Sequence, residues 1–271
     1  MSATNTNFSG SIPELYDRYL GPVMFEPYAA DLARRVADCA DGPVLEMACG
    51  TGILTRQLRT HLVPTVPLVA TDLSQPMLDY ARTKLDKLQR VDWQQADIAA
   101  LPFPDASFAA VVCQFGLMFV PDKHAAFREV RRVLVRGGLL AFNVWDSMAH
   151  NPQGHIAHET ITKFFPVDPP QFFKVPHGFH EAEVLRSLLT AHGFDQVQLE
   201  AVTLEAYSRT AKALAIGLIQ GSPVSTAIRE RGVPFQPIVE AVAVALARVG
   251  GEAPFRSTMQ AIVVTARAGA A

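Results

Sequence analysis

A glycine-rich turn carries the clearest chemical signal in this sequence. Residues 44–52 read VLEMACGTG, so a short, mostly apolar run leads into Gly50 and Gly52, and a helical pattern follows. Glycines let the backbone approach a ligand closely, and the free N–H groups at the start of a helix attract anionic atoms. Asp72 stands 20 positions after Gly52, at the end of the next predicted strand. A carboxylate there can accept both hydroxyls of a ribose, so the pattern predicts a nucleoside ligand.

Two further residues indicate which kind of nucleoside this would be. A dinucleotide fingerprint needs a third glycine at the position that Thr55 occupies, and that glycine is missing. Glu46 lies in the predicted strand four residues before Gly50. A carboxylate there would repel a pyrophosphate but could hold an ammonium group. The combination favours a nucleoside that bears an amino acid over a dinucleotide.

A parallel sheet would bring the turn and Asp72 together, and the order of the predicted elements supplies one. Short apolar runs alternate with amphipathic stretches, which is typical of a doubly wound, mostly parallel α/β sheet. Strands are predicted over residues 43–47, 66–71, 91–95, 108–113, 139–145, 195–207 and 257–266. Helices are predicted over residues 29–40, 53–62, 74–88, 125–135, 181–192, 211–219 and 237–249. The alternation breaks over residues 147–180, which are rich in His, Pro and Phe and show little periodicity.

Length and charge limit the classes of function. The chain has 271 residues, 24 Lys and Arg against 26 Asp and Glu, and a formal net charge of −2. Hydrophobic residues make up 49% of it, which excludes a disordered chain, and the near-neutral charge argues against a nucleic-acid partner. No apolar run reaches the roughly 18 residues of a membrane span, so we expect none.

The N-terminal residues and the cysteines indicate a cellular compartment. The first ten residues lack the basic and apolar regions of a signal peptide. The three cysteines, Cys39, Cys49 and Cys113, are too far apart for a CxxC metal site, and their odd number suits a reducing compartment. We therefore expect a cytoplasmic protein.

On these motifs the sequence resembles the class I S-adenosylmethionine-dependent methyltransferases. Among them it is similar to the group that includes the ubiquinone and menaquinone C-methyltransferases and many small-molecule methyltransferases. The resemblance is close over about residues 12–146 and loose beyond. It rests on the segments VLEMACGTG (44–52), TDLSQPMLDYAR (71–82), QADIAALPFPDASF (95–108), VVCQFGLMFVPD (111–122) and RRVLVRGGLLAFNVW (131–145). It implies a Rossmann-like sheet of seven strands, the last one antiparallel.

The resemblance also implies a role for each matching residue. Asp72 would hold the ribose hydroxyls, while Leu73 and Met77 would flank the adenine. Asp97 would read the adenine amino group with Ile98 beside the ring, and Gln114 would face the methionine part. The full set of expected donor-binding residues is Tyr16, Glu46, Ala48, Cys49, Gly50, Gly52, Asp72, Leu73, Met77, Asp97, Ile98 and Gln114. Cys49 is expected there as a small packed residue rather than a nucleophile.

The predicted organisation is one methyltransferase domain over residues 1–271. An N-terminal flap (11–28) would fold over the donor with Tyr16, Tyr19 and Phe25. A donor-binding core (29–146) would be followed by an insertion (147–180) that acts as a lid over the methyl acceptor. Residues 181–271 would complete the sheet.

The insertion is the expected acceptor site. Five of the 16 phenylalanines lie within residues 164–180, which favours a small apolar or aromatic acceptor, although the same rings could instead pack on the domain or on a partner subunit. A homodimer is therefore permitted. His150, His155 and His177 are candidates for a general base, because imidazole titrates near neutral pH. No cysteine or carboxylate completes a zinc pattern with the histidines, so we expect no metal.

The expected reaction is methyl transfer by in-line displacement. The donor is already activated, so alignment and exclusion of water can supply much of the rate, and a base is needed only when the acceptor must lose a proton. Two alternatives stay open at this point: a non-catalytic S-adenosylmethionine-binding protein, and an NAD-dependent oxidoreductase, against which Thr55 and Glu46 speak.

Overall fold

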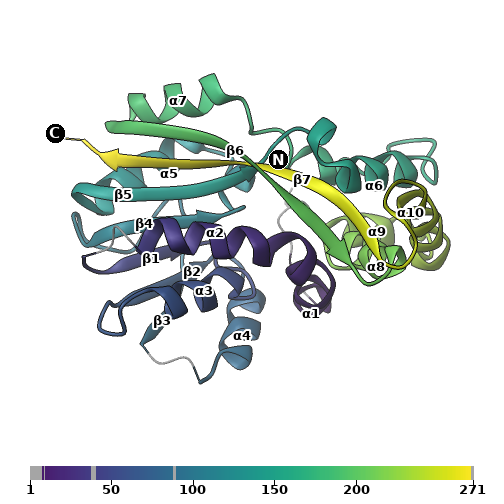
Figure 1. The fold of residues 1–271 in the computed structure, drawn as a ribbon, viewed down its shortest axis with the longest axis horizontal. Helices are drawn as coiled ribbons and strands as arrows, with labels where there is room; N and C mark the ends of the chain where they lie inside the picture. Colours follow the sequence, from purple (N-terminus) through teal and green to yellow (C-terminus); the bar gives the residue numbers. More distant parts are fainter. Residues whose placement is uncertain (1–7, 9, 38–40, 88–89, 270–271) are drawn as a thin grey trace.

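A seven-stranded sheet forms the centre of the computed structural model, which describes residues 8, 10–37, 41–87 and 90–269 (Figure 1). The strand order is β3-β2-β1-β4-β5-β7-β6. The first five strands pair in parallel, and β7 runs antiparallel to both β5 and β6. The strands are β1 (Val44–Met47), β2 (Leu68–Asp72), β3 (Val91–Gln95), β4 (Phe108–Gln114), β5 (Leu134–Trp145), β6 (Phe194–Ser208) and β7 (Phe255–Ala268). The predicted doubly wound α/β class is confirmed.

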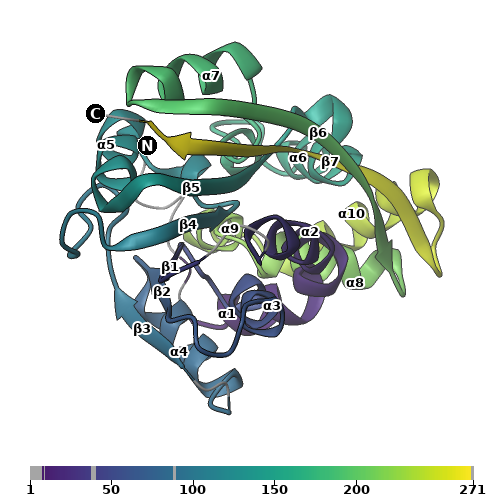
Figure 2. The same ribbon diagram turned by 60° about the vertical axis from the view of Figure 1, so that its left-hand side comes forward.

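Helices cover both faces of the sheet, which is why its inner strands are almost fully apolar. The right-handed crossovers that join parallel strands place α3 and α4 on one face and α5 on the other. Helix α2 packs against α3, and α7 packs against α5 and β6 (Figure 2). These helices are α2 (Glu26–Ala37), α3 (Ile53–His61), α4 (Gln75–Lys84), α5 (Lys123–Val133) and α7 (Ala182–Ala191). Positions 38–40 and 88 of the predicted helices, with Cys39, lie outside the described residues.

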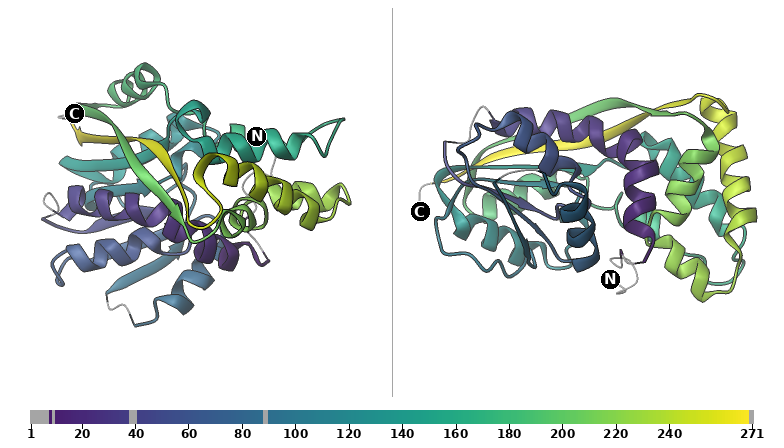
Figure 3. Two further views of the ribbon diagram at one scale, coloured as in Figure 1. Left: turned by 45° about the vertical axis from the view of Figure 1, so that its right-hand side comes forward. Right: turned by 90° about the horizontal axis from the view of Figure 1, so that it is seen from below.

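The strands β6 and β7 extend far beyond the parallel part of the sheet. Their outer ends reach a group of helices that lies beside the carboxyl ends of the parallel strands (Figure 3). This group contains α6 (Pro152–Thr162), α8 (Ala211–Gln220), α9 (Val224–Glu230) and α10 (Phe235–Gly250). These two long strands, which are joined through α8, α9 and α10, therefore place helices from the C-terminal third of the chain at the edge where the sheet can bind a ligand.

Two of these helices were not expected from the sequence. Helix α6 occupies part of the segment that shows little periodicity, because its buried face includes the polar residues Gln153, His158 and Thr160. A buried polar face hides the apolar spacing on which a helix prediction rests. The rest of the segment contains the short 3₁₀ turns η4 (Met148–His150) and η5 (Phe172–Lys174). Helix α9 spans only seven residues and lies between longer helices.

The N-terminal segment is helical from the short α1 (Ile12–Leu15) through the π-helix η2 (Tyr16–Phe25) and directly into α2. Helix α8 packs against η2 at Gly217, where an added Cβ would lie 2.7 Å from Leu20 Cδ2 and 2.8 Å from Tyr19 Cβ. Only glycine allows this close approach, so the flap and the C-terminal helices form one packed unit.

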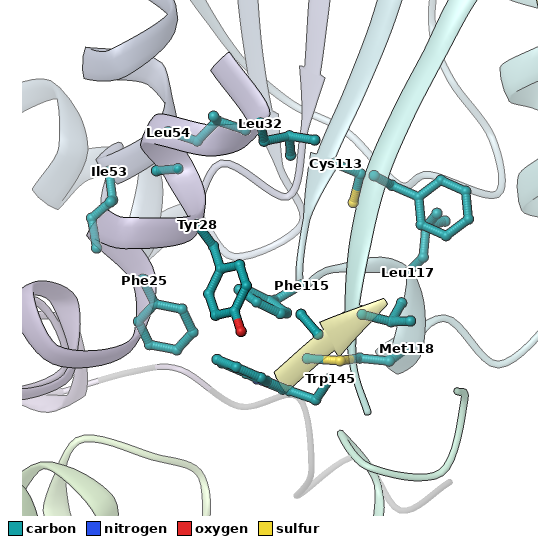
Figure 4. Close-up of a cluster of buried hydrophobic side chains, with 14 of the residues drawn as sticks. Phe25, Tyr28, Leu32, Ile53, Leu54, Cys113, Phe115, Leu117, Met118 and Trp145 are labelled. Atoms are coloured by element: carbon teal, nitrogen blue, oxygen red, sulfur yellow. The ribbon is translucent and has the colours of Figure 1, made fainter. Parts of the chain in front are cut away.

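An aromatic cluster joins the flap to the ends of β4 and β5. The rings of Phe115 and Trp145 stack with centroids 3.9 Å apart, and Phe25 and Tyr28 pack edge-on or tilted against them (Figure 4). The Tyr28 hydroxyl lies 2.9 Å from the carbonyl oxygens of Val202 and Met259, to which it can donate. Such pairs contribute about 0.5–1.5 kcal/mol each beyond burial, so the cluster holds these strand ends firmly.

Among the described residues, no helix is long and apolar enough to cross a membrane.

Candidate donor and acceptor site

The glycine turn between β1 and α3 follows a strained path. Ala48, Gly50 and Gly52 all have positive φ values, of 51°, 55° and 80°. The Cys49 N–H donates to the Thr71 carbonyl (2.8 Å), which ties the turn to β2. An added Cβ on Gly50 would meet no atom within 4 Å, whereas one on Gly52 would lie 2.5 Å from Leu85 Cδ1. Gly50 therefore keeps space open for a ligand, and Gly52 lets α4 pack against the turn.

Asp72 organises this turn from the end of β2. The backbone N–H of Gly50 donates to its Oδ2 and that of Ser74 donates to its Oδ1, both at 2.8 Å. Burial raises the pKa of the Asp72 carboxyl, and these N–H groups oppose the shift. A carboxylate has about four acceptor positions, so two are left for ribose hydroxyls.

Glu46 lies beneath the turn rather than on the cavity wall. Its side chain is 1% exposed, and neither carboxylate oxygen has a hydrogen-bond partner of good geometry among the described residues, although Thr55 lies close enough to lower its pKa. Burial raises its pKa to about 8, and the negative charge of Asp72 adds to the effect. A buried carboxyl group without a partner is unfavourable. Because Glu46 does not line the cavity, it can act on the amino group of a methionine moiety only through the glycine turn or a bridging water.

A cavity of about 370 Å³ opens at the carboxyl ends of the parallel strands. Nine of the twelve expected donor residues line it: Tyr16, Ala48, Gly50, Asp72, Leu73, Met77, Asp97, Ile98 and Gln114. Asp97 is exposed, and one of its oxygens already accepts from the Ala99 N–H (2.9 Å). Gln114 Oε1 has no partner among the described residues, so it is available to a ligand.

The N-terminal flap covers the cavity at the end beside the glycine turn. Tyr16 stacks on Phe25 with centroids 4.6 Å apart, and burial together with the charges of Asp72 and Asp17 raises the pKa of its phenol far above the usual value. Asp17 accepts from the Thr51 hydroxyl (3.0 Å) and pairs with Lys84 Nζ (2.5 Å). The flap is therefore fastened to the glycine turn and to α4.

The other expected residues lie elsewhere. Cys49 and Gly52 belong to the turn but do not line the cavity, and burial raises the pKa of the Cys49 thiol, so it is a poor nucleophile. Of the three histidine candidates, His177 lines the cavity. His150 is exposed and lies 3.4 Å from Asp146 Oδ2, and His155 is exposed on α6.

Sequence reasoning missed most of the apolar wall. Phe115 and Trp145 directly follow or end β4 and β5, so the rule that ligands bind at the carboxyl ends of parallel strands could have identified them. Phe172 and Phe173 come from the insertion whose phenylalanines the sequence already indicates as the acceptor site. The other wall residues come from the N-terminal segment, the turn after β4, the insertion and the C-terminal helices with the loop after α8: Phe8, Leu20, Met24, Phe119, Pro176, Leu218 and Ser222. Apart from the clustered phenylalanines of the insertion, no local pattern marks these positions.

Comparison with known proteins identifies the family. Residues 44–138 match the family described as a methyltransferase domain. A ubiquinone/menaquinone biosynthesis C-methyltransferase of Shewanella frigidimarina is 33% identical over 174 residues, which are 59% of this chain and 69% of that protein.

Solved structures show the same fold. The YcgJ protein of Bacillus subtilis has a TM-score of 0.60 and 16% identity, covering 90% of this chain and 100% of that one. Phosphoethanolamine N-methyltransferase 2 of Haemonchus contortus, in complex with S-adenosyl-L-methionine, has a TM-score of 0.63 and 15% identity, covering 98% of this chain and 58% of that one. Together with the sequence relatives, these matches show that the protein belongs to the class I S-adenosylmethionine-dependent methyltransferases, with S-adenosylmethionine as its methyl donor.

Proposed function

We propose that the protein methylates a small, apolar or aromatic acceptor that binds in the part of the cavity beyond the donor. The observation that carries the proposal is the continuity of the cavity. Donor-type residues such as Asp72 and Gln114 line the same space as Trp145, Phe172 and Phe173. A single space of this kind can align the donor and the acceptor and exclude water from both.

At the donor end, the residues take the roles that their positions favour. Asp72 binds the ribose hydroxyls, Leu73, Met77 and Ile98 enclose the adenine, and Asp97 accepts from its amino group. Gln114 faces the amino-acid moiety, and Glu46 supports the glycine turn from beneath. The donor supplies a methyl group on a positively charged sulfur, and the chain supplies its orientation.

At the acceptor end, the insertion over residues 147–180 acts as the lid. Phe172 and Phe173 are 7% and 5% exposed, and Phe172 stacks with Phe119 at 6.2 Å. Aromatic side chains on several sides of a cavity favour an apolar, planar ligand. The Shewanella relative carries the name of a quinone-pathway C-methyltransferase, which is consistent with a ring as the guest.

The test removes the lid rings and compares two readouts. The double substitution Phe172→Ala and Phe173→Ala should lower methyl transfer to phenols and hydroquinones at least about tenfold, because two apolar contacts are lost. Its affinity for S-adenosylhomocysteine, measured by calorimetry, should stay within about twofold. Phe165→Ala is the matched control, since Phe165 is 5% exposed in the same insertion but does not line the cavity.

Two outcomes would contradict the proposal. If the double variant and Phe165→Ala lose turnover equally, the rings serve stability rather than acceptor binding. If the double variant loses product affinity as strongly as turnover, the insertion belongs to the donor site.

A further inference from the structure

His177 is an imidazole on the mostly apolar acceptor wall, and its tautomer is set by the backbone. His177 Nδ1 lies 2.8 Å from the carbonyl oxygen of Asp146. A carbonyl only accepts, so Nδ1 carries the hydrogen and Nε2 carries the lone pair. Among the hydrogen bonds of the described residues, Nε2 takes part in none.

His177 Nε2 lies close to a glycine of α6. A Cβ added to Gly154 would lie 2.8 Å from His177 Nε2, and both residues line the cavity. Gly154 has an ordinary negative φ inside α6, so helix geometry alone does not require glycine there. Because glycine has no side chain, the imidazole can approach α6 this closely and no Cβ covers Nε2.

The surroundings of His177 hold it in place and keep it neutral. Burial lowers the pKa of His177 to about 4, the Asp146 carbonyl opposes the shift, and His180 adds to the lowering. The Asp146 carboxylate accepts from Gln260 Nε2 at Oδ2 (2.6 Å) and from the Ser147 N–H at Oδ1, and His150 Nδ1 lies 3.4 Å from Oδ2. The imidazole is thus a fixed acceptor over the whole neutral pH range.

We propose that His177 Nε2 accepts a hydrogen bond from a hydroxyl group of the methyl acceptor and takes its proton during transfer. The inference rests on the proposed function and narrows the acceptor to an apolar molecule with a phenolic or enolic O–H. That is the chemistry that a single lone pair on an apolar wall recognises.

The proton balance of the step is complete. The O–H bond breaks and its proton moves to Nε2. The electron pair of that bond stays on the acceptor, where it supports formation of the new bond to the methyl carbon. The bond between that carbon and sulfur breaks, and its electron pair remains on sulfur. As the new bond forms, the hydroxyl becomes strongly acidic, so even a weak base accepts its proton. The imidazolium then releases this proton to water.

The first test measures binding with two probes that differ only in the hydroxyl. With the protein saturated by S-adenosylhomocysteine, 1-naphthol should bind about fivefold more tightly than its methyl ether, the value of one net hydrogen bond. His177→Asn removes the Nε2 lone pair while its amide N–H can still reach the Asp146 carbonyl, and this variant should lose the preference. His155→Asn is the matched control, because His155 is exposed outside the cavity.

The second test measures turnover. His177→Asn should lower kcat for a phenol that is un-ionised at the assay pH by about 10²-fold or more. It should leave kcat for a nitro-substituted, already ionised phenol within about threefold, because no proton then has to move. Gly154→Ala should resemble His177→Asn by crowding Nε2.

The possible failures are distinguishable. Equal binding of naphthol and its ether to the wild type, or equal losses of turnover with both phenols, would overturn the role of His177 alone. If the wild-type protein binds neither 1-naphthol nor its methyl ether, the proposed apolar acceptor would be overturned as well.

Discussion

The two glycines of the turn between β1 and α3 are required for different physical reasons. We therefore expect alanine at one to affect mainly ligand affinity and alanine at the other to affect mainly stability. Gly50→Ala keeps a φ of 55° and adds a Cβ into open space, whereas Gly52→Ala keeps a φ of 80° and adds a Cβ 2.5 Å from Leu85 Cδ1. The neighbouring Ala48 already adopts a φ of 51°, so this loop accommodates a Cβ in the left-handed region.

The expected magnitudes follow from these contacts. A left-handed alanine costs about 1–2 kcal/mol of stability at either position. At Gly52 the overlap with Leu85 adds about 1–3 kcal/mol, toward the lower end because the end of a leucine side chain can turn aside. Gly52→Ala should thus lower the free energy of unfolding by about 2–4 kcal/mol, and Gly50→Ala by about 1–2 kcal/mol.

Binding should show the opposite order. The new Cβ of Gly50→Ala projects where the amino-acid part of the donor would pass, so affinity for S-adenosylhomocysteine should fall at least about tenfold. Gly52→Ala should change that affinity less, because its Cβ faces α4 rather than the cavity. Urea unfolding and isothermal calorimetry on both variants give the two readouts. Unchanged affinity in Gly50→Ala would refute the placement of the donor along this turn.

Two further predictions concern the acidic residues of the donor end. Asp72→Ala should weaken binding of S-adenosylmethionine by well over tenfold in calorimetry, since ribose hydrogen bonds to a carboxylate and the anchor of Gly50 are lost together; unchanged affinity would overturn the assignment. Glu46 has a pKa raised to about 8 in the folded protein against about 4.3 when unfolded, so the stability that it contributes is present below about pH 4 and is lost as pH rises toward 8. Urea unfolding of Glu46→Gln should show a weaker fall in stability between pH 5 and 8 than the wild type, and identical slopes would contradict the burial argument.

The sheet was predictable because its signals are local. Apart from β3, which reads VDWQQ, each parallel strand is an apolar run bounded by turn residues. The bounds of β1 to β4 fall within two residues of the predicted ranges, and β5 begins five residues before its predicted start. The turn at Gly50 and the acid at Asp72 are likewise local, since both end a strand and parallel topology brings strand ends together. Helix α6 escaped prediction because its buried face contains Gln153 and His158, which find their environment only after the C-terminal helices pack beside them.

The acceptor wall could not be read from spacing for the same reason. The three histidines that are candidates for a general base lie within residues 150–177, and the sequence does not indicate which of them reaches the cavity. The structure places His177 on the cavity, while His150 and His155 are exposed. That difference depends on the Asp146 carbonyl at the end of β5 and on Gly154 in α6, which are brought together by tertiary packing.

The two ends of the cavity therefore have different physical origins. The donor end is built from backbone N–H groups and acids at the ends of β1 and β2, where the parallel sheet leaves little freedom. The acceptor end is built from the flap, the ends of β4 and β5, the insertion and the helices that join β6 to β7. Helix α8 packs on the flap through the close contact at Gly217. Substitutions in α6, α8 or η5 can reshape this wall without disturbing the hydrogen bonds of Asp72. Changes of acceptor in related chains should thus concentrate after Asp146, while the glycine turn and Asp72 stay as they are.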